Sequence, residues 1–395
     1  MILGISCYPT YGGSGVVATE LAMALAGSGD EVHIVSYALP SRLALLEAAA
    51  PEARLFYHEV VVPHYPLFEY PPYSLALATK MVEVARHHSL DLLHVHYAVP
   101  NAVSAVLARQ ILAPLPLPVV TTLHGTDITL VGNDPSYLET TRWGIEQSDE
   151  VTAVSENLTA DTRHKLGVDK PITVVPNFID PRRYDRLAGT PGARRWAGAG
   201  ERLLVHISNF RPVKRVDDVV EVFHRVRERF PVRLLMVGDG PERPRVEQRC
   251  REYGSCKDIT FIGNLPLVEE VLIGADVFLL PSQSESFGLA ALEAMSCKVP
   301  VVATRAGGLP EVIADGECGL LFPVGDVDGM ADGVARLLAD EPLRRRFGDA
   351  GFQRAREVFA VDRVVARYRQ VYERAIAGTD GGPPRRSAAA AAAPR

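Results

Sequence analysis

The sequence predicts an α/β protein made of two domains, each built on a parallel β-sheet. Short β-branched runs alternate with helix-length amphipathic segments, first over 2–5, 16–26 and 31–35, an order typical of βαβ units. The alternation starts again after residues 176–181, with an apolar run at 203–207. At 395 residues the chain is long enough for two or three domains. We therefore expect two Rossmann-like domains that face each other across a cleft.

Further strands are expected in both halves. The apolar runs at 92–95 and 119–122 belong to the first domain, and those at 233–237, 277–280 and 299–302 to the second. In open parallel sheets ligands bind beyond the carboxyl ends of the strands, so functional residues are sought directly after these runs.

Prolines and a Gly-rich basic segment at 189–200 mark the linker, because neither periodicity continues there. The C-terminal end carries Gly-Gly-Pro-Pro and six successive alanines, a composition typical of disorder. The predicted division is an N-terminal domain over 1–176, a C-terminal domain over 177–360, a helix over 361–377 that packs back on the N-terminal domain, and a disordered tail over 378–395.

Composition and charge exclude several classes of protein. Hydrophobic residues make up 47% and charged residues 23%, which excludes wholesale disorder, and the formal net charge of −6 argues against a nucleic-acid partner. The five cysteines are scattered without paired zinc-ligand spacing, so we expect a reducing cytoplasm and no metal site. The apolar start has no basic leader, and the apolar stretch 98–120 is broken by Arg109 and prolines, so we expect no signal peptide and no membrane insertion.

The turn at 12–15 follows the first predicted strand and opens the next helix. Its sequence, Gly-Gly-Ser-Gly, permits a tight turn, and free amides at a helix start favour an anion. It lacks the third glycine of a dinucleotide fingerprint. Contact with a phosphate or carboxylate and a purely structural turn are both compatible with this pattern.

Two later strands of the first domain end in histidine-containing motifs. One ends in the sequence His-Val-His-Tyr at 94–97, and the other is followed by His-Gly-Thr-Asp at 124–127. A single histidine is more often structural than catalytic. His124 is the better candidate, because the residues after it supply a flexible backbone and polar partners.

A cluster of cations, Arg211, Lys214 and Arg215, follows the first strand of the second domain. Arginine offers forked donors and lysine a compact charge, so the cluster suits a phosphate. A solvated helix start is the alternative.

Two acidic residues stand out near the end of the second domain. Glu285 lies in a loop, whereas Glu293 falls inside an otherwise apolar helix over 289–295. A buried carboxylate needs donors, such as ribose hydroxyls; a solvent-facing Glu293 and an internal salt bridge are the alternatives.

The Asp-x-Asp at Asp326 and Asp328 is interpreted as the N-cap of a helix over 330–338 rather than as a metal site.

Together these motifs resemble the retaining glycosyltransferases of family 4, which have the GT-B fold. The resemblance covers residues 1 to about 377 and implies an N-terminal domain that holds the acceptor and a C-terminal domain that holds a nucleotide sugar. Within the family, the motifs look like those of members that transfer N-acetylglucosamine from UDP-N-acetylglucosamine to the hydroxyl of L-malate, the opening step of bacillithiol biosynthesis. The residues that carry the resemblance are 12–15, 94–97, 124–129, 208–215, Glu285 with Glu293, and 307–311.

For the donor, the resemblance implies that Glu293 binds the ribose and that Lys214 neutralises the diphosphate. Many family members have arginine where Asn209 stands, so the second diphosphate cation is assigned to Arg211. The predicted donor-binding residues are Gly15, Asn209, Arg211, Lys214, Glu285, Phe287, Gly288, Leu289 and Glu293. The predicted catalytic residues are His124, Glu285, Lys214 and Arg211.

Malate carries two carboxylates, and the amides of Gly13 and Ser14 offer a cradle for one of them. By resemblance Arg142 binds the other, with Tyr97 and Thr126 as hydroxyl donors; an ordinary surface ion pair is the alternative for Arg142. Other acceptors, such as an inositol phosphate, a polysaccharide or a lipid, also fit the family.

A UDP leaving group can be stabilised by two cations and helix-start amides, so we expect catalysis without a metal or another cofactor. The resemblance implies a same-face displacement with retention of configuration. A homodimer is possible. A two-lobed binding protein without catalysis is the alternative of another class, and the acidic pair and the missing export signal count against it.

Overall fold

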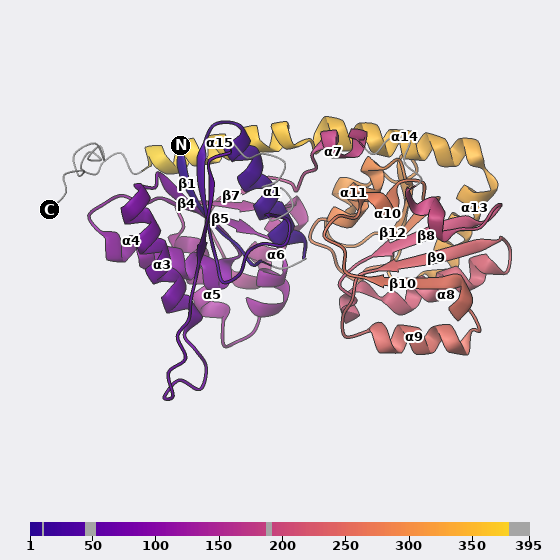
Figure 1. The fold of residues 1–395 in the computed structure, drawn as a ribbon, viewed down its shortest axis with the longest axis horizontal. Helices are drawn as coiled ribbons and strands as arrows, with labels where there is room; N and C mark the ends of the chain where they lie inside the picture. Colours follow the sequence, from indigo (N-terminus) through magenta and orange to yellow (C-terminus); the bar gives the residue numbers. More distant parts are fainter. Residues whose placement is uncertain (10–11, 44–52, 187–191, 379–395) are drawn as a thin grey trace. The chain divides into compact units, whose positions relative to one another are not determined.

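The structure is a computed structural model that describes residues 1–9, 12–43, 53–186 and 192–378. They form two compact units, one of Met1–Val175 with the chain from Val365 onward, the other of Pro176–Val364. Each unit is a parallel sheet with flanking helices (Figure 1), which confirms the predicted α/β fold class. The tail predicted over 378–395 lies, beyond residue 378, outside the described residues.

The strands of the first unit are β1 (Ile2–Ser6), β2 (Glu31–Ser36), β3 (Leu55–Glu59), β4 (Leu92–His96), β5 (Val119–Leu123), β6 (Glu150–Ala153) and β7 (Ile172–Val174). They form one sheet in the order β3-β2-β1-β4-β5-β6-β7, and all neighbouring pairs are parallel. Its helices are α1 (Gly13–Gly27), α3 (Tyr73–His88), α4 (Val103–Leu112), α5 (Leu138–Gln147) and α6 (Glu156–Leu166), with short π-helical turns η2 (Ala98–Ala102) and η3 (Asp127–Val131).

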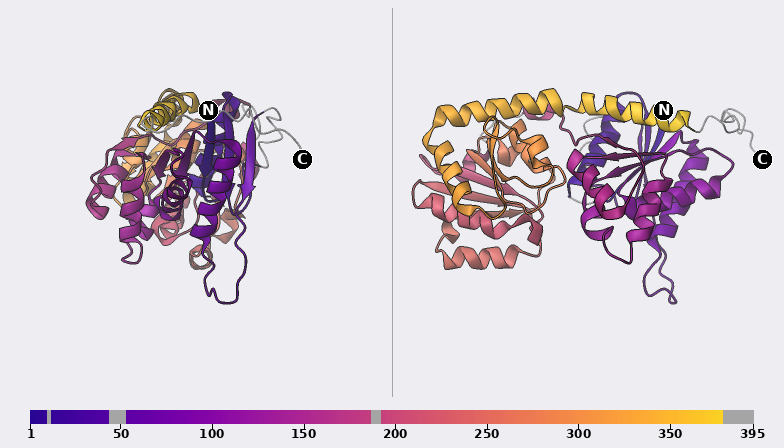
Figure 2. Two further views of the ribbon diagram at one scale, coloured as in Figure 1. Left: turned by 90° about the vertical axis from the view of Figure 1, so that its left-hand side faces the viewer. Right: turned by 180° about the vertical axis from the view of Figure 1, so that it is seen from behind.

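Every residue of β2, β4 and β5 is buried, because helices cover both faces of the sheet (Figures 1 and 2).

The last helix, α15 (Val361–Ala377), belongs to this unit from Val365 onward. Its Tyr372 hydroxyl lies 2.8 Å from Nδ1 of His94, and its Arg369 donates to Asp30 at 2.6 Å. Helix α15 thus adds to the cover of the first sheet.

The strands of the second unit are β8 (Arg202–Ile207), β9 (Val232–Val237), β10 (Ile259–Gly263), β11 (Val277–Leu280), β12 (Val301–Thr304) and β13 (Gly319–Phe322), in the sheet order β10-β9-β8-β11-β12-β13. All neighbouring pairs are parallel. Its helices are α7 (Pro181–Arg186), α8 (Val216–Arg227), α9 (Arg243–Glu252), α10 (Glu269–Leu272), α11 (Leu289–Ser296), α12 (Leu309–Val312), α13 (Val327–Ala339) and α14 (Glu341–Val358), with 3₁₀ turns η4 (Gly192–Trp196), η5 (Pro212–Lys214) and η6 (Cys256–Asp258).

Two local predictions for this unit can be compared with the structure. Asp326 caps α13, since its Oδ1 accepts the amide of Gly329 at 2.9 Å, and the N-cap prediction is confirmed. The strand predicted at 299–302 begins later, at Val301, because Pro300 has no N–H for the ladder. None of the described helices is long and apolar enough to cross a membrane.

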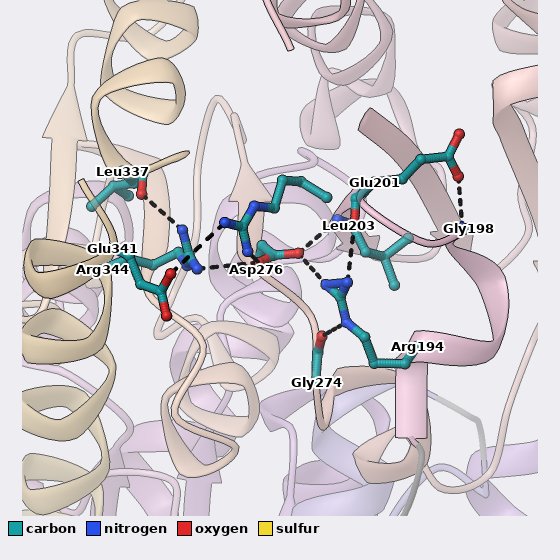
Figure 3. Close-up of polar contacts among 10 residues, drawn as sticks. Arg194, Gly198, Glu201, Leu203, Gly274, Asp276, Leu337, Glu341 and Arg344 are labelled. Atoms are coloured by element: carbon teal, nitrogen blue, oxygen red, sulfur yellow. Dashed lines mark hydrogen bonds and ion pairs between the residues drawn. The ribbon is translucent and has the colours of Figure 1, made fainter. Parts of the chain in front are cut away.

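A buried carboxylate fixes the amino edge of the second sheet (Figure 3). Asp276, 6% exposed, accepts the amide of Leu203 at 2.8 Å and so ties the start of β11 to β8. Arg194 and Arg344 reach it from two sides, and Arg202 lies 3.2 Å from its Oδ1. Three guanidinium groups therefore compensate one buried charge.

Candidate active site

In the first unit the predicted residues meet at the carboxyl edge of the sheet, between β1 and β4. The chain leaves β1 toward β2 and leaves β4 toward β5, so the strand order reverses here, as at the ligand site of open α/β sheets. The hydroxyl of Ser14, in the first turn of α1, lies 3.1 Å from the hydroxyl of Tyr97, which follows β4. The structure thus brings the Gly13–Gly15 turn and Tyr97 together.

The amides of this turn point to an anion site. Val16 donates the first intrahelical bond of α1, to the carbonyl of Gly12, so the amides of Gly13, Ser14 and Gly15 precede it in the first turn. Gly13 is exposed and Gly15 is buried. An anion over this helix start gains from the amides and from the helix dipole.

Three histidines form a connected row behind Tyr97. Nδ1 of His96, the last residue of β4, lies 2.8 Å from Nε2 of His124, which follows β5. The ring of His94 is tilted by 35° against that of His96, with centroids 4.4 Å apart, and contacts Thr122 through Nε2 at 2.7 Å. Burial lowers the pKa of His124 and of His94 to about 3, and that of His96 well below its ordinary value. All three rings are therefore neutral at physiological pH.

The hydrogen bonds also suggest where the proton of His124 resides. The buried Nε2 of His96 has no partner within the described part of the chain. Because a buried N–H without a partner is rarer than a buried acceptor without one, we assign the proton of His96 to Nδ1, from which it is donated to His124. His124 then carries its own proton on Nδ1. In this tautomer Nδ1 of His124 can donate a hydrogen bond, and Nε2 is occupied by the bond from His96.

Asp127 stabilises the conformation of the loop after β5, a role that the sequence did not reveal. Its carboxylate accepts the amides of Gly125 at 2.8 Å, Ala98 at 3.1 Å and His124 at 3.2 Å. Burial raises its pKa to about 6, although the three amides act in the opposite direction. Thr126, the predicted acceptor residue, lies inside this loop and is half-buried. Asp127 therefore joins the loops after β4 and β5.

Arg142 is not brought together with these residues. Its Nε donates to the carbonyl of Leu166, the last residue of α6, and its guanidinium lies 3.5 Å from Glu139. α6 starts at the carboxyl edge after β6 and ends before β7, so Leu166 lies at the opposite, amino edge. In the structure Arg142 makes a helix-end contact and a surface ion pair, since the last carbonyls of a helix attract a guanidinium; its contact with an acceptor stays a prediction.

In the second unit the corresponding reversal of strand order lies between β8 and β11. Nζ of Lys214, in the turn after β8, lies 2.7 Å from Oε1 of Glu285, in the loop after β11. Ser282 donates to the same oxygen at 2.8 Å. The side chains of Lys214 and Glu285 are 20% and 11% exposed. Lys214 and Glu285, which the sequence places in the same two predicted sets, therefore form an ion pair at this edge.

The loop that carries Glu285 is packed backbone to backbone. Gly308 donates its amide to the carbonyl of Glu285 at 2.8 Å, and a Cβ on Gly307, whose φ is +55°, would lie 2.0 Å from the same oxygen. Gly288 precedes α11 with a φ of +99°. The ring of Phe287 is buried against Phe359, with centroids 5.6 Å apart at 81°. The amides at the start of α11, beginning with Leu289, are the groups of this loop suited to a sugar or phosphate oxygen.

Glu293 is buried in α11 with 6% of its surface exposed, so the solvent-facing alternative is wrong. It has an interaction inside the protein, and its charge adds to burial in raising the pKa of the neighbouring Cys297 thiol. A carboxylate retained at such a position needs donors, from the protein or from a ligand.

The remaining donor residues lie on the turn after β8. Asn209 and Arg211 are both exposed. Sequence reasoning missed the loop beneath them, where a Cβ on Gly238 would lie 1.8 Å from the carbonyl oxygen of Ser208 and one on Gly240 would lie 2.0 Å from that of Asn209. The Gly-Asp-Gly after the predicted strand at 233–237 was the available signal.

Comparisons with known proteins show the family of this chain. Residues 196–354 match the family described as Glycosyl transferases group 1, and residues 11–183 match Glycosyltransferase Family 4. The chain is 46% identical to N-acetyl-alpha-D-glucosaminyl L-malate synthase of Bacillus anthracis, over 94% of this chain and 96% of that protein. The chain belongs to this family of glycosyltransferases.

Membership in the family confirms the resemblance predicted from the motifs. A more distant relative is D-inositol 3-phosphate glycosyltransferase of Nocardia farcinica, 28% identical over 85% of this chain and 79% of that protein. Among solved structures, the Anabaena protein HepE in complex with UDP and glucose is similar, with a TM-score of 0.79 at 19% identity over 94% of this chain and 99% of that chain. The glycosyltransferase of Rickettsia africae has a TM-score of 0.76 at 18% identity, over 95% and 98% of the two chains. These two likenesses support the GT-B fold.

Proposed function

We propose that this glycosyltransferase moves N-acetylglucosamine from UDP-N-acetylglucosamine to the hydroxyl of L-malate, the first step of bacillithiol biosynthesis, with retention of configuration. The observation that carries the proposal is the 46% identity, over nearly the whole length, to a synthase named for these groups. The anion-binding features in both units support it.

On the donor side, the ion pair of Lys214 and Glu285 determines which groups can bind the diphosphate. An ammonium has three N–H donors, so Lys214 can keep Glu285 with one and direct the others at phosphate oxygens. Because Glu285 compensates the charge of Lys214, the diphosphate needs a second cation, and Arg211 on the same turn provides it. Glu293 would accept the ribose hydroxyls. No metal is required in this arrangement.

On the acceptor side, one carboxylate of malate would lie over the amides of Gly13 and Ser14, next to the hydroxyls of Tyr97 and Thr126. His124 would donate from Nδ1 to a hydroxyl of the donor sugar. Arg142 has no part in this proposal.

In the proposed reaction the bond between C1 of the sugar and the diphosphate oxygen breaks, and the malate hydroxyl oxygen bonds to C1 on the same face. The hydroxyl proton passes to the departing phosphate oxygen, which leaves as UDP. Lys214, Arg211 and the helix-start amides stabilise the charge that develops on that phosphate.

The direct test is to incubate the protein with UDP-N-acetylglucosamine and a panel of acceptors, measuring UDP release, product mass and the anomeric configuration by NMR. We expect an α-linked product with malate. Turnover with D-inositol 3-phosphate and none with malate would overturn the acceptor, and a β-linked product would overturn retention. The homodimer and the cytoplasmic location remain predictions from the sequence.

A further inference from the structure

Three histidines of the first unit, distant in the sequence, converge at the outer end of its sheet. His33 lies in β2, His58 in the edge strand β3, and His88 is the last residue of α3. The register pairs Val35 with His58, so His33 and His58 lie on the same face of the two strands. The candidate ligand nitrogens of the three rings all lie within 4.8 Å of one another.

The contacts among the rings are close. Nδ1 of His33 lies 2.8 Å from Nε2 of His58, and the ring centroids of His33 and His88 are 4.0 Å apart. Nε2 of His33 lies 2.9 Å from Oε1 of Glu31, whose other oxygen is paired with Arg54. The carboxylate of Glu31 thus orients the ring of His33 so that Nδ1 faces His58.

The protonation states suit a cation. Burial lowers the pKa of His58 to about 4 and lowers those of His33 and His88, with the neighbouring imidazoles adding to the effect. All three rings are therefore neutral near pH 7, the form in which histidine ligates a metal. His88 also ends α3, where the helix dipole favours positive charge.

We propose that His33, His58 and His88 bind one divalent transition-metal cation, of which Zn²⁺ is the representative. The chemistry of the donors carries the assignment, because three imidazoles with a carboxylate behind one of them form the arrangement in which histidine holds zinc. Nδ1 of His33 and Nε2 of His58 would be ligands, and Glu31 would keep the proton on Nε2 of His33. His58 and His88 are half-buried, so the cation can enter from solvent.

Two of the three ligands, His33 and His58, need only a small adjustment. A tetrahedral cation at the usual zinc to nitrogen distance of about 2.0–2.1 Å separates its ligand nitrogens by about 3.3 Å. The 2.8 Å between His33 and His58 would open by roughly 0.5 Å, within the reach of side-chain rotation. The hydrogen bond between the two rings is replaced by two bonds to the cation.

The site lies away from the residues proposed for catalysis. α3 ends before β4 begins, so His88 lies at the amino edge of the sheet, whereas Ser14 and Tyr97 lie at its carboxyl edge. His33 pairs with Gly4 of β1, which pairs with Leu93 of β4, so His33 lies level with a position four residues before Tyr97, about 13 Å away along the strand. The cation would therefore stabilise the first unit, by joining the edge strand β3 to α3, and would leave the transfer reaction unchanged.

The test is titration of the chelator-stripped full chain, without a histidine tag, with Zn²⁺ in competition with a chromophoric chelator. We expect one site per chain and a melting temperature that rises with Zn²⁺. His88→Ala should weaken Zn²⁺ binding at least about hundredfold and abolish the rise, since it removes a ligand. Glu31→Gln should weaken binding by about tenfold to hundredfold.

The adjacent His87 provides a matched control. It is exposed and its ring contacts that of His88, but it is not in the group of three. His87→Ala should leave affinity and stoichiometry unchanged. Equal losses in His87→Ala and His88→Ala, or a wild type without a stoichiometric site, would overturn the proposal. Neither result affects the proposed function, whose activity we expect to persist in excess chelator.

Discussion

Replacing Lys214 by methionine separates the binding of a diphosphate from the binding of a nucleoside. The substitution keeps an unbranched side chain, one atom shorter, and removes its charge. In the structure Nζ lies 2.7 Å from Glu285, and both side chains are mostly buried, so little solvent screens the charge. A hydrogen bond to a charged group contributes about 1.5–3 kcal/mol, and its loss corresponds to a decrease in UDP affinity of about tenfold to 150-fold.

The assay is isothermal titration calorimetry with UDP, UMP and uridine. We expect Lys214→Met to lose UDP affinity by that factor, to lose less for UMP, and to bind uridine as the wild type does, because uridine carries no phosphate. Turnover should fall at least in proportion, since negative charge on the diphosphate increases in the transition state. Equal losses for UDP and uridine would refute the diphosphate role and point to a disturbed fold.

Two further variants test the reasoning. Lys298 forms an exposed ion pair with Asp349 at 2.8 Å in the same unit, so Lys298→Met should change neither UDP affinity nor turnover. Lys214→Met also leaves Glu285 without its cation. Adding Glu285→Gln to Lys214→Met should therefore recover part of any lost stability without restoring UDP binding. Recovery of UDP binding would show that Lys214 acts through Glu285 alone.

The remaining predictions concern four other features. Glu293→Ala should weaken UDP and uridine alike by about tenfold to hundredfold, because a ribose contact is common to both; unchanged calorimetric affinity would exclude the ribose role. Arg142→Ala should lower the melting temperature and leave the malate KM unaltered, since Arg142 holds the end of α6; a tenfold higher KM in steady-state kinetics would restore the acceptor role. Asp276→Asn should lower the free energy of unfolding by about 3 kcal/mol in denaturant titrations, because Arg344 loses its buried counter-charge; a change within error would contradict the network. Activity should persist in excess chelator, and loss restored by magnesium or manganese would reopen Asp326 as a ligand.

The sequence by itself determined the class of fold and the strand edges at which we expect the functional residues. Short apolar runs predict strands, and strands that alternate with helices form only a few layered arrangements. Two parallel sheets therefore followed from the local pattern alone. The ends of those strands then located Ser14, Tyr97, Lys214 and Glu285 before any coordinates, since parallel strands share one carboxyl edge. The cap at Asp326 was equally local, because capping involves residues within one turn.

Only the tertiary structure decided which of these residues touch. The pairing of Lys214 with Glu285 joins positions 71 residues apart, and sequence spacing carries no information on a distance across two loops. Arg142, in contrast, does not lie with the other predicted acceptor residues. Packing decides which neighbour its helix face meets, and that neighbour is the end of α6, where Arg142 donates to the carbonyl of Leu166.

The grouping of His33, His58 and His88 depended most on tertiary structure. No local motif links a mid-strand residue, an edge-strand residue and a helix end, and the scattered cysteines indicated no metal site. Strand order alone places β3 beside β2, and the packing of α3 then brings His88 to the two strands. Periodicity encodes which face of an element is buried, whereas the contacts made by that face depend on the elements that the fold places next to it.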